Sequence, residues 1–266
     1  MEKINSVSLE LFQNFNDITY YDEPHEYYLG GNQFISVTTL IHKYQEEFDE
    51  EYWSNYKANE YNVPQWKIKR AWDFINRKGT MKGSIIHDYA ENALLNKVFE
   101  YPQQDIINEF GFDPIYPEYL TTKRHVDKFL KVSKNKLIPI KTELVVHDNE
   151  SQVAGMVDLL FYNVKENELQ IWDWKTNKAF YYNNPYQNLL GTLNMLEDCD
   201  LELYSLQMEM YKYIIEKNTS LKLGKSYLVW VSHNNDDFEI IESQNRRFFV
   251  ERMFQERINN LKKATA

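Results

Sequence analysis

Apolar residues recur along this chain with helical spacing in some stretches and crowd into short strand-like runs in others. Residues 153–162 and 169–176 are apolar, β-branched or aromatic at most positions, and a short charged turn separates them. This pattern predicts two strands of one hairpin. Because side chains alternate between the two faces of a strand, we expect Asp173 and Lys175 to point the same way, with Trp174 opposite.

The remaining apolar pattern predicts one α/β domain. Expected helices lie at residues 37–44, 52–61, 65–77, 84–97, 121–135, 201–217 and 244–263, with a short one within 1–19. Expected strands lie at residues 20–29, 33–36, 141–147, 225–232 and 238–242. Gly79 and Gly83 are expected to break the helical region, and residues 101–119 to form mostly loop with a short helix near Gln103. This order favours a mixed central sheet flanked by helices, with the core at about residues 81–266 and an N-terminal helical elaboration at about 1–80.

The composition bounds the class of protein. With 266 residues, of which 43% are hydrophobic, the chain is long enough to bury a core. It has no run of about 18 apolar residues, and its first residues lack the apolar stretch of a secretory signal. The one cysteine, Cys199, excludes a disulfide framework, a four-cysteine zinc site and an iron–sulfur cluster bound by this chain alone. We therefore expect a cytoplasmic protein, in the host cytoplasm if the gene is viral.

Charge is distributed unevenly. The net charge of −10, taken alone, argues against a nucleic-acid partner. Residues 123–141 nevertheless carry seven basic residues against one acid, and residues 64–82 carry six against one. The local field matters more than the net charge for phosphate binding, so Lys82, Arg124, Lys128 and Lys131 are candidates for nucleic-acid contacts. Solvated helix faces would explain the same runs.

Two acids and a lysine on neighbouring predicted strands indicate metal chemistry. Asp158 lies in an otherwise apolar strand, where a carboxylate rarely stays without a partner. Oxygen ligands hold a hard divalent cation, and a lysine beside them stabilises developing negative charge, as metal-assisted phosphodiester hydrolysis requires. Asp173 and Lys175 supply the second acid and the lysine. The plainer interpretations are a hydrogen-bonded core acid at Asp158 and a surface ion pair between the other two.

Short motifs occur in a fixed order along the chain. They are a helix histidine and glutamate (His87, Glu91), a strand glutamate (Glu143), G-x-x-D (Gly155, Asp158), D-x-K (Asp173, Lys175) and Q-x-x-x-Y (Gln207, Tyr211). This ordered set resembles the RecB-type branch of the PD-(D/E)XK nucleases. The segment at residues 34–41, FISVTTLI, is similar to the S-V-T-T segment of phage exonucleases and of the mitochondrial genome maintenance exonuclease. Many relatives carry cysteines for an iron–sulfur cluster, so this chain resembles the members without one.

The resemblance implies a restriction-endonuclease-like core and a metal-dependent deoxyribonuclease. The activity it implies is an exonuclease on DNA ends or single strands, with little sequence specificity and with 5′-phosphate and 3′-hydroxyl products. One or two Mg²⁺ or Mn²⁺ ions would be held by three side chains and one carbonyl, those of His87, Asp158, Asp173 and Trp174.

The resemblance also implies roles for residues outside that set. Lys175 would act on the attacking water or the developing charge, together with the two aspartates. Gln207 and Tyr211 would position the site and the substrate backbone. Glu91 would orient the histidine, and Glu143 would be either an outer ligand or a salt bridge at a strand end.

Alternatives remain open for the front of the chain and for the function. The aromatic residues near Tyr52 and Trp66 would stack on bases or, as helical aromatics usually do, pack in a core. The competing functions are a sequence- or structure-specific endonuclease and a non-catalytic DNA-binding subunit of a recombination or repair complex. DNA is the expected partner, with recombination or replication proteins as further candidates. No membrane is expected, nor ATP, because no G-x-x-x-x-G-K-[ST] loop occurs.

Overall fold

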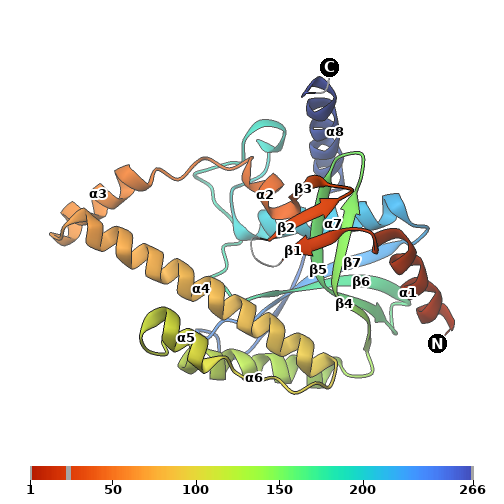
Figure 1. The fold of residues 1–266 in the computed structure, drawn as a ribbon, viewed down its shortest axis with the longest axis horizontal. Coiled ribbons are helices and arrows are strands. Elements are labelled where there is room, and N and C mark those ends of the chain that lie inside the picture. Colours follow the sequence, from red (N-terminus) through yellow and green to blue (C-terminus); the bar gives the residue numbers. More distant parts are fainter. Residues whose placement is uncertain (1, 22–24, 265–266) are drawn as a thin grey trace.

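The computed structural model describes residues 2–21 and 25–264, and its centre is a mixed β-sheet with helices on both faces (Figure 1). The strands are β1 (Thr19–Tyr21), β2 (Glu26–Leu29), β3 (Asn32–Ser36), β4 (Leu137–Asp148), β5 (Val153–Asn163), β6 (Glu168–Lys175), β7 (Leu223–Trp230) and β8 (Glu239–Glu242). They are ordered β1-β2-β3-β5-β6-β7-β8, and β4 also pairs with β5. The pairs β3–β5 and β6–β7 are parallel and the others antiparallel. The α/β class with a mixed sheet is therefore confirmed.

Helices from the two ends of the chain cover one face of the sheet, and helices from its middle cover the other. The helices are α1 (Glu2–Phe15), α2 (Val37–His42), α3 (Glu50–Tyr61), α4 (Gln65–Leu94), α5 (Gln103–Phe110), α6 (Tyr116–Ser133), α7 (Asp200–Asn218) and α8 (Arg247–Ala264), with a 3₁₀ turn η1 (Gly191–Leu193). One buried cluster joins α1, α2, α7 and α8 to the sheet, and the other joins α4, α5 and α6 to it. Within the described residues, no helix is long and apolar enough to cross a membrane.

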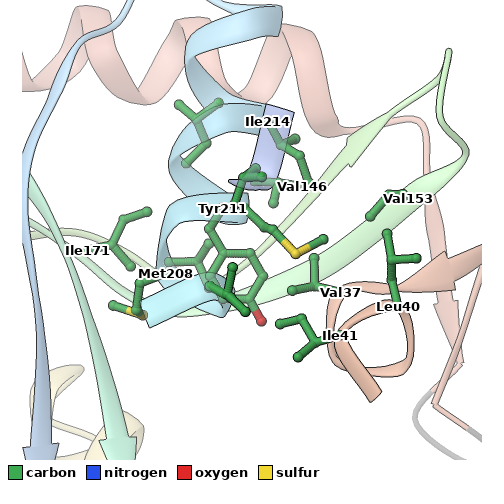
Figure 2. Packing of buried hydrophobic residues seen from close by; sticks show 14 of the residues in the cluster. Val37, Leu40, Ile41, Val146, Val153, Ile171, Met208, Tyr211 and Ile214 are labelled. Atoms are coloured by element: carbon green, nitrogen blue, oxygen red, sulfur yellow. The ribbon is translucent and has the colours of Figure 1, made fainter. Parts of the chain in front are cut away.

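Tyr211 of α7 lies in the middle of the first cluster (Figure 2). Around it are Val37 and Ile41 of α2, Val146 of β4 and Ile171 of β6. All of these side chains are at most 3% exposed. Burial of this kind is the main stabilising contribution to a fold, at about 1.5–3 kcal/mol per large apolar side chain. It fixes α7 against the sheet and so sets the position of the polar residues on that helix.

The helix α4 runs unbroken through the two glycines that the sequence analysis expected to interrupt it, so that expectation is wrong. A glycine inside a helix costs only about 1 kcal/mol. The second half of α4 offsets this cost by burying Ile85, Ile86 and Ala90 against the sheet, each at most 4% exposed. Packing, which the local sequence does not show, outweighs the local preference for a break.

In the region at residues 101–119, the short helix expected near Gln103 is confirmed as α5. The expectation that the region is mostly loop is wrong, because α5 and the start of α6 together make up most of it. Two prolines lie at helix starts, where the missing amide hydrogen costs nothing: Pro102 precedes α5, and Pro117 falls in the first turn of α6. Asp113 Oδ1 accepts hydrogen bonds from the amides of Ile115 and Tyr116, both at 2.9 Å, and so begins α6.

The front of the chain differs from its prediction in two respects. The single strand expected at residues 20–29 is seen as β1 and β2, and its residues 22–24 lie outside the described residues. In α3 and the start of α4, which lie away from the sheet in Figure 1, Tyr52, Trp53, Tyr56 and Trp66 are between 43% and 58% exposed. These aromatics are therefore not core residues. Their packing interpretation is wrong, while base stacking stays untested.

Candidate active site

Asp158 lies where β5 and β6 separate. The ladder between these strands runs from Leu159 paired with Trp172 to the turn, so Asp158 lies one residue beyond its end. The carboxylate takes over the role of a ladder partner, because Oδ2 accepts a hydrogen bond from the Trp174 amide at 3.0 Å. A short side chain held by a main-chain donor has little freedom. The end of the hairpin thus fixes this acid beside β6.

His87 of α4 lies between Asp158 and the Trp174 carbonyl. Its Nδ1 is 3.2 Å from Asp158 Oδ2, and its Nε2 is 3.2 Å from the carbonyl oxygen of Trp174. Both neighbours are acceptors, while a neutral imidazole carries a single proton. The neutral ring can therefore satisfy only one of them. Either a second proton or a bound cation is needed to satisfy the whole group.

A buried polar chain connects β6 to α7. Lys175 Nζ is 2.6 Å from Asp173 Oδ2 and donates to Gln207 Oε1 at 3.0 Å. Gln207 Nε2 in turn donates to the Tyr211 hydroxyl at 3.1 Å. The lysine ammonium also lies 4.2 Å from the ring centre of Tyr204. Asp173 and Lys175 thus share one face, as predicted, while Trp174 packs in the other cluster.

Gly155 has a steric reason to be glycine. A Cβ at this position would lie 2.6 Å from Tyr211 Cε1 and 3.1 Å from Val37 Cγ2. Both neighbours are in the packed cluster of Figure 2, so neither can move away cheaply. The glycine of the G-x-x-D motif therefore lets the tyrosine of the Q-x-x-x-Y motif approach β5. Tyr211 in turn holds Gln207, which holds Lys175.

Burial and mutual charge shift the pKa values of Asp173 and Lys175. Burial, and then the charge of Asp158, raise the pKa of Asp173 from 3.8 to about 6, against the opposing pull of Lys175. Burial lowers the pKa of Lys175, but Asp173, Tyr204 and Asp158 outweigh it, so that the pKa is raised overall. The lysine is therefore charged at neutral pH. A cation near the two aspartates would relieve the repulsion between them.

Glu91 and Glu143 lie at the border of this group. Glu91 Oε1 accepts a hydrogen bond at 2.7 Å from Thr142, whose side chain is buried. Glu143 is exposed as a residue, yet desolvation of its carboxyl, followed by the charges of Glu91, Asp88 and Asp158, raises its pKa. Its backbone has φ of 46°, uncommon for a non-glycine residue. The contact with Thr142 is with a strand hydroxyl, not with His87, so the expected orienting role of Glu91 stays a prediction.

The donor set fits a hard or borderline divalent cation. It has two carboxylates, an imidazole and a carbonyl, and the buried oxygen Asp173 Oδ2 has an ion-pair contact but no hydrogen bond within the described residues. In the same part of the chain, no three His, Cys, Asp or Glu side chains are already gathered tightly enough to enclose an ion. Binding a cation would therefore require small adjustments of Asp173, Asp158 and His87.

A cleft of about 830 Å³ opens onto this group. Its lining includes His87, Trp174 and Lys175 of this group, together with Lys78, Lys82, Glu118 and His233. Of the four residues expected to contact nucleic acid, the structure brings only Lys82 to this cleft. Glu118 and His233 were not predicted to belong to the site, because no local motif marks residues that meet only through the fold.

The other three expected nucleic-acid contacts lie farther along α6. Lys128 forms an ion pair with Asp237, so its charge is partly compensated. Arg124 donates to Thr121 at 3.2 Å, and Lys131 is exposed. Glu118, in the first turn of α6, lines the cleft, whereas these three side chains do not.

The chain matches no family model and no curated protein. Among solved structures it is similar to a protein from Eubacterium rectale named provisionally as an exonuclease, with 12% identity and a TM-score of 0.40 over 70% of this chain and 65% of that one. The chain thus spans less than two thirds of that protein. It is also similar to the protein SSO0001, with 12% identity and a TM-score of 0.27 over 68% of this chain and 86% of that one. Similarities this distant do not establish a shared family.

Proposed function

We propose that this chain is a metal-dependent deoxyribonuclease of the RecB-type PD-(D/E)XK kind, acting as an exonuclease on DNA ends or single strands. The observation that supports this most is the convergence of five groups at one end of β6, beside a cleft that three of their residues line: His87, Asp158, the Trp174 carbonyl, Asp173 and Lys175. Hydrolysis of a phosphodiester needs anionic ligands and a fixed positive charge in one place. Three elements of the fold supply these parts: α4 carries His87, β5 carries Asp158, and β6 carries the other three.

The ion that these ligands would hold is Mg²⁺ or Mn²⁺, and the imidazole makes Mn²⁺ at least as suitable. When bound, such an ion supplies a water of lowered pKa and offsets the negative charge of the phosphate. Asp158 and His87 would hold it from β5 and α4. Asp173 and the Trp174 carbonyl would hold it from β6.

Lys175 acts as a fixed positive charge. Its ammonium is held by Asp173, Gln207 and the ring of Tyr204, so its position does not depend on substrate. A pre-positioned charge stabilises the transition state without reorganisation at the moment of reaction. Gln207 and Tyr211 are positioning residues, because they reach the reacting atoms only through this lysine.

The proposed substrate is DNA, held mainly through its phosphates. Contacts to phosphates carry no base information, so little sequence specificity is expected. Exonuclease action is tested by incubating the protein with linear DNA and with a covalently closed circle of the same sequence, in Mn²⁺. The proposal predicts degradation of the linear form and survival of the circle. Rapid cleavage of the circle would instead show an endonuclease.

A further inference from the structure

Five charged or titratable side chains that line the cleft form what we call the lysine cluster: Lys78, Lys82, Lys178, Glu118 and His233. They come from α4, the start of α6, the segment after β6 and the loop between β7 and β8. All five line the same cleft as His87 and Lys175. The cluster is therefore a built feature of the cleft wall, assembled from distant parts of the sequence.

Glu118 holds the cluster together. Its Oε1 accepts from Lys78, and its Oε2 lies 3.1 Å from Lys82 Nζ and 3.2 Å from His233 Nδ1. Lys82 is only 6% exposed, which is unusual for a lysine. Burial raises the pKa of Glu118, but the hydrogen bonds from Lys78 and Lys82 lower it overall. The carboxylate is therefore ionised and fixes the direction of both lysines.

The cluster keeps an excess of positive charge. The cluster contains three lysines and one carboxylate, which leaves two positive charges when His233 is neutral. The state of His233 reflects this field: burial lowers its pKa, and Lys82, Lys78 and Lys178 lower it further against the pull of Glu118. A protein with a net charge of −10 thus places a positive region inside the cleft. The complementary ligand is an anion.

The lysine cluster and the candidate active site share one helix and one cleft. Lys82 precedes His87 by five residues on α4, which corresponds to about 7.5 Å along the helix axis. We propose that the lysine cluster is a phosphate-binding subsite, which holds a phosphate group of the substrate strand next to the one that is cleaved. This inference rests on the proposed nuclease function. The plainer role, an ion-pair network that only ties α4 to α6, makes a different prediction for each variant below.

The first test measures DNA affinity without cleavage, by fluorescence anisotropy of a labelled single strand with Ca²⁺ in place of Mg²⁺. Loss of one phosphate contact lowers the salt slope by about 0.7, which corresponds to about fivefold in affinity at 0.1 M salt. We expect this change in Lys78→Gln. The control is Lys225→Gln. Lys225 is an exposed lysine of β7 that forms an ion pair with Glu242 of β8 and does not line the cleft, so its loss should leave the affinity for DNA unchanged.

Glu118→Gln separates binding from structure. If the cluster binds phosphate, removing the carboxylate leaves the lysines unopposed, and affinity for DNA should rise about threefold. If the network only ties the helices together, both Glu118→Gln and Lys78→Gln should lower the melting temperature and leave affinity equal to that of Lys225→Gln. That second result would overturn the subsite.

The source of the phosphate is identified with three strands that carry a 5′-phosphate, a 3′-phosphate or hydroxyls at both ends. If Lys78→Gln loses affinity for one phosphorylated strand only, the subsite holds a terminal monoester. An equal loss for all three assigns it to an internal diester. Either result supports the subsite.

Inorganic phosphate tests the subsite independently of DNA. Millimolar phosphate should raise the melting temperature of the unmodified protein and not that of Lys78→Gln, because a ligand that binds only the folded state stabilises it. If this holds in a protein that cleaves no DNA, phosphate binding by the lysine cluster stands, while the nuclease proposal, and with it the placement beside a cleaved phosphate, fails. If the protein cleaves DNA and Lys78→Gln matches the unmodified protein in both assays, the nuclease proposal stands and the subsite fails.

Discussion

The cost of keeping Asp173 ionised gives a quantitative prediction. Its pKa rises from 3.8 to about 6 because of burial first and the charge of Asp158 second. At about 1.36 kcal/mol per pKa unit, this shift corresponds to about 3 kcal/mol. The folded state holds this proton more tightly than the unfolded chain does. The contribution of the Asp173 carboxyl to the free energy of unfolding therefore falls as pH rises from about 4 to 6. The full cost of ionising this buried carboxyl persists at pH 8 without metal.

A bound divalent cation should remove this cost, and Asp158→Asn should abolish the effect. At a concentration about one hundred times Kd, Mn²⁺ adds about 2.7 kcal/mol to the free energy of unfolding. At about 2–4 °C per kcal/mol for a domain of this size, the melting temperature should rise by about 5–10 °C. The asparagine of this variant would keep the side-chain shape but not the anionic ligand, so the rise should fall below about 1 °C.

The assay is thermal unfolding at pH 8 across a Mn²⁺ titration, with EDTA as the reference. Without metal, Asp158→Asn should melt close to the unmodified protein. The variant loses the negative charge that accepts from the Trp174 amide and lies beside His87, which is destabilising. It also removes the repulsion between that charge and Asp173, which is stabilising. The matched control is Asp236→Asn, a substitution in the loop before β8, which should keep the full response. An unchanged melting temperature in the unmodified protein, or an equal rise in Asp158→Asn, would refute the reasoning.

The same contacts give four further predictions. Lys175→Ala should retain DNA and Mn²⁺ binding but lose about 10²–10³-fold in kcat, while the control Lys212→Ala on α7 should keep the kcat of the unmodified protein. If Lys175→Ala instead loses DNA binding and keeps the rate for bound substrate, the role of Lys175 is contradicted. Gly155→Ala forces a contact with Tyr211, so unfolding measurements should show a loss of about 1–3 kcal/mol, and equal stability would show that the approach of Tyr211 is not tight. Arg124→Glu combined with Lys128→Glu should weaken DNA binding equally for all sequences and reduce the dependence of affinity on salt concentration, as measured by fluorescence anisotropy. An unchanged salt dependence would show that these two residues of α6 do not contact DNA and that the DNA contacts lie in the cleft. Without metal, the stability difference between the unmodified protein and Asp173→Asn should change between pH 4 and 6 and be flat above pH 7, as measured by urea unfolding, and a difference independent of pH would contradict the raised pKa.

The sequence predicted the elements that carry their own signal. The hairpin of β5 and β6 follows from two apolar runs around a charged turn, and the face shared by Asp173 and Lys175 follows from strand alternation. The helix that carries Gln207 and Tyr211 was placed within one residue at each end. These features depend on local periodicity, which a single sequence contains.

Other features depend on contacts between distant segments. Nothing local shows that α4 continues through Gly79 and Gly83, because burial against the sheet decides it. The parallel pairing of β3 with β5 through Ile35 and Ser36 joins the front of the chain to the main sheet, and it was not expected. The lysine cluster likewise forms only when α4, α6 and the β7–β8 loop meet.

The proposed activity is metal-dependent hydrolysis of DNA by the group around Asp158 and Asp173. Its most direct test is digestion of end-labelled single- and double-stranded DNA with Mg²⁺, Mn²⁺ or EDTA, comparing the unmodified protein with Asp158→Ala and Asp173→Ala. Circular dichroism of each variant confirms that it is folded. We predict cleavage by the unmodified protein with either ion, none in EDTA, and none by either folded variant. Cleavage that persists in EDTA, or in either variant at the rate of the unmodified protein, would contradict it.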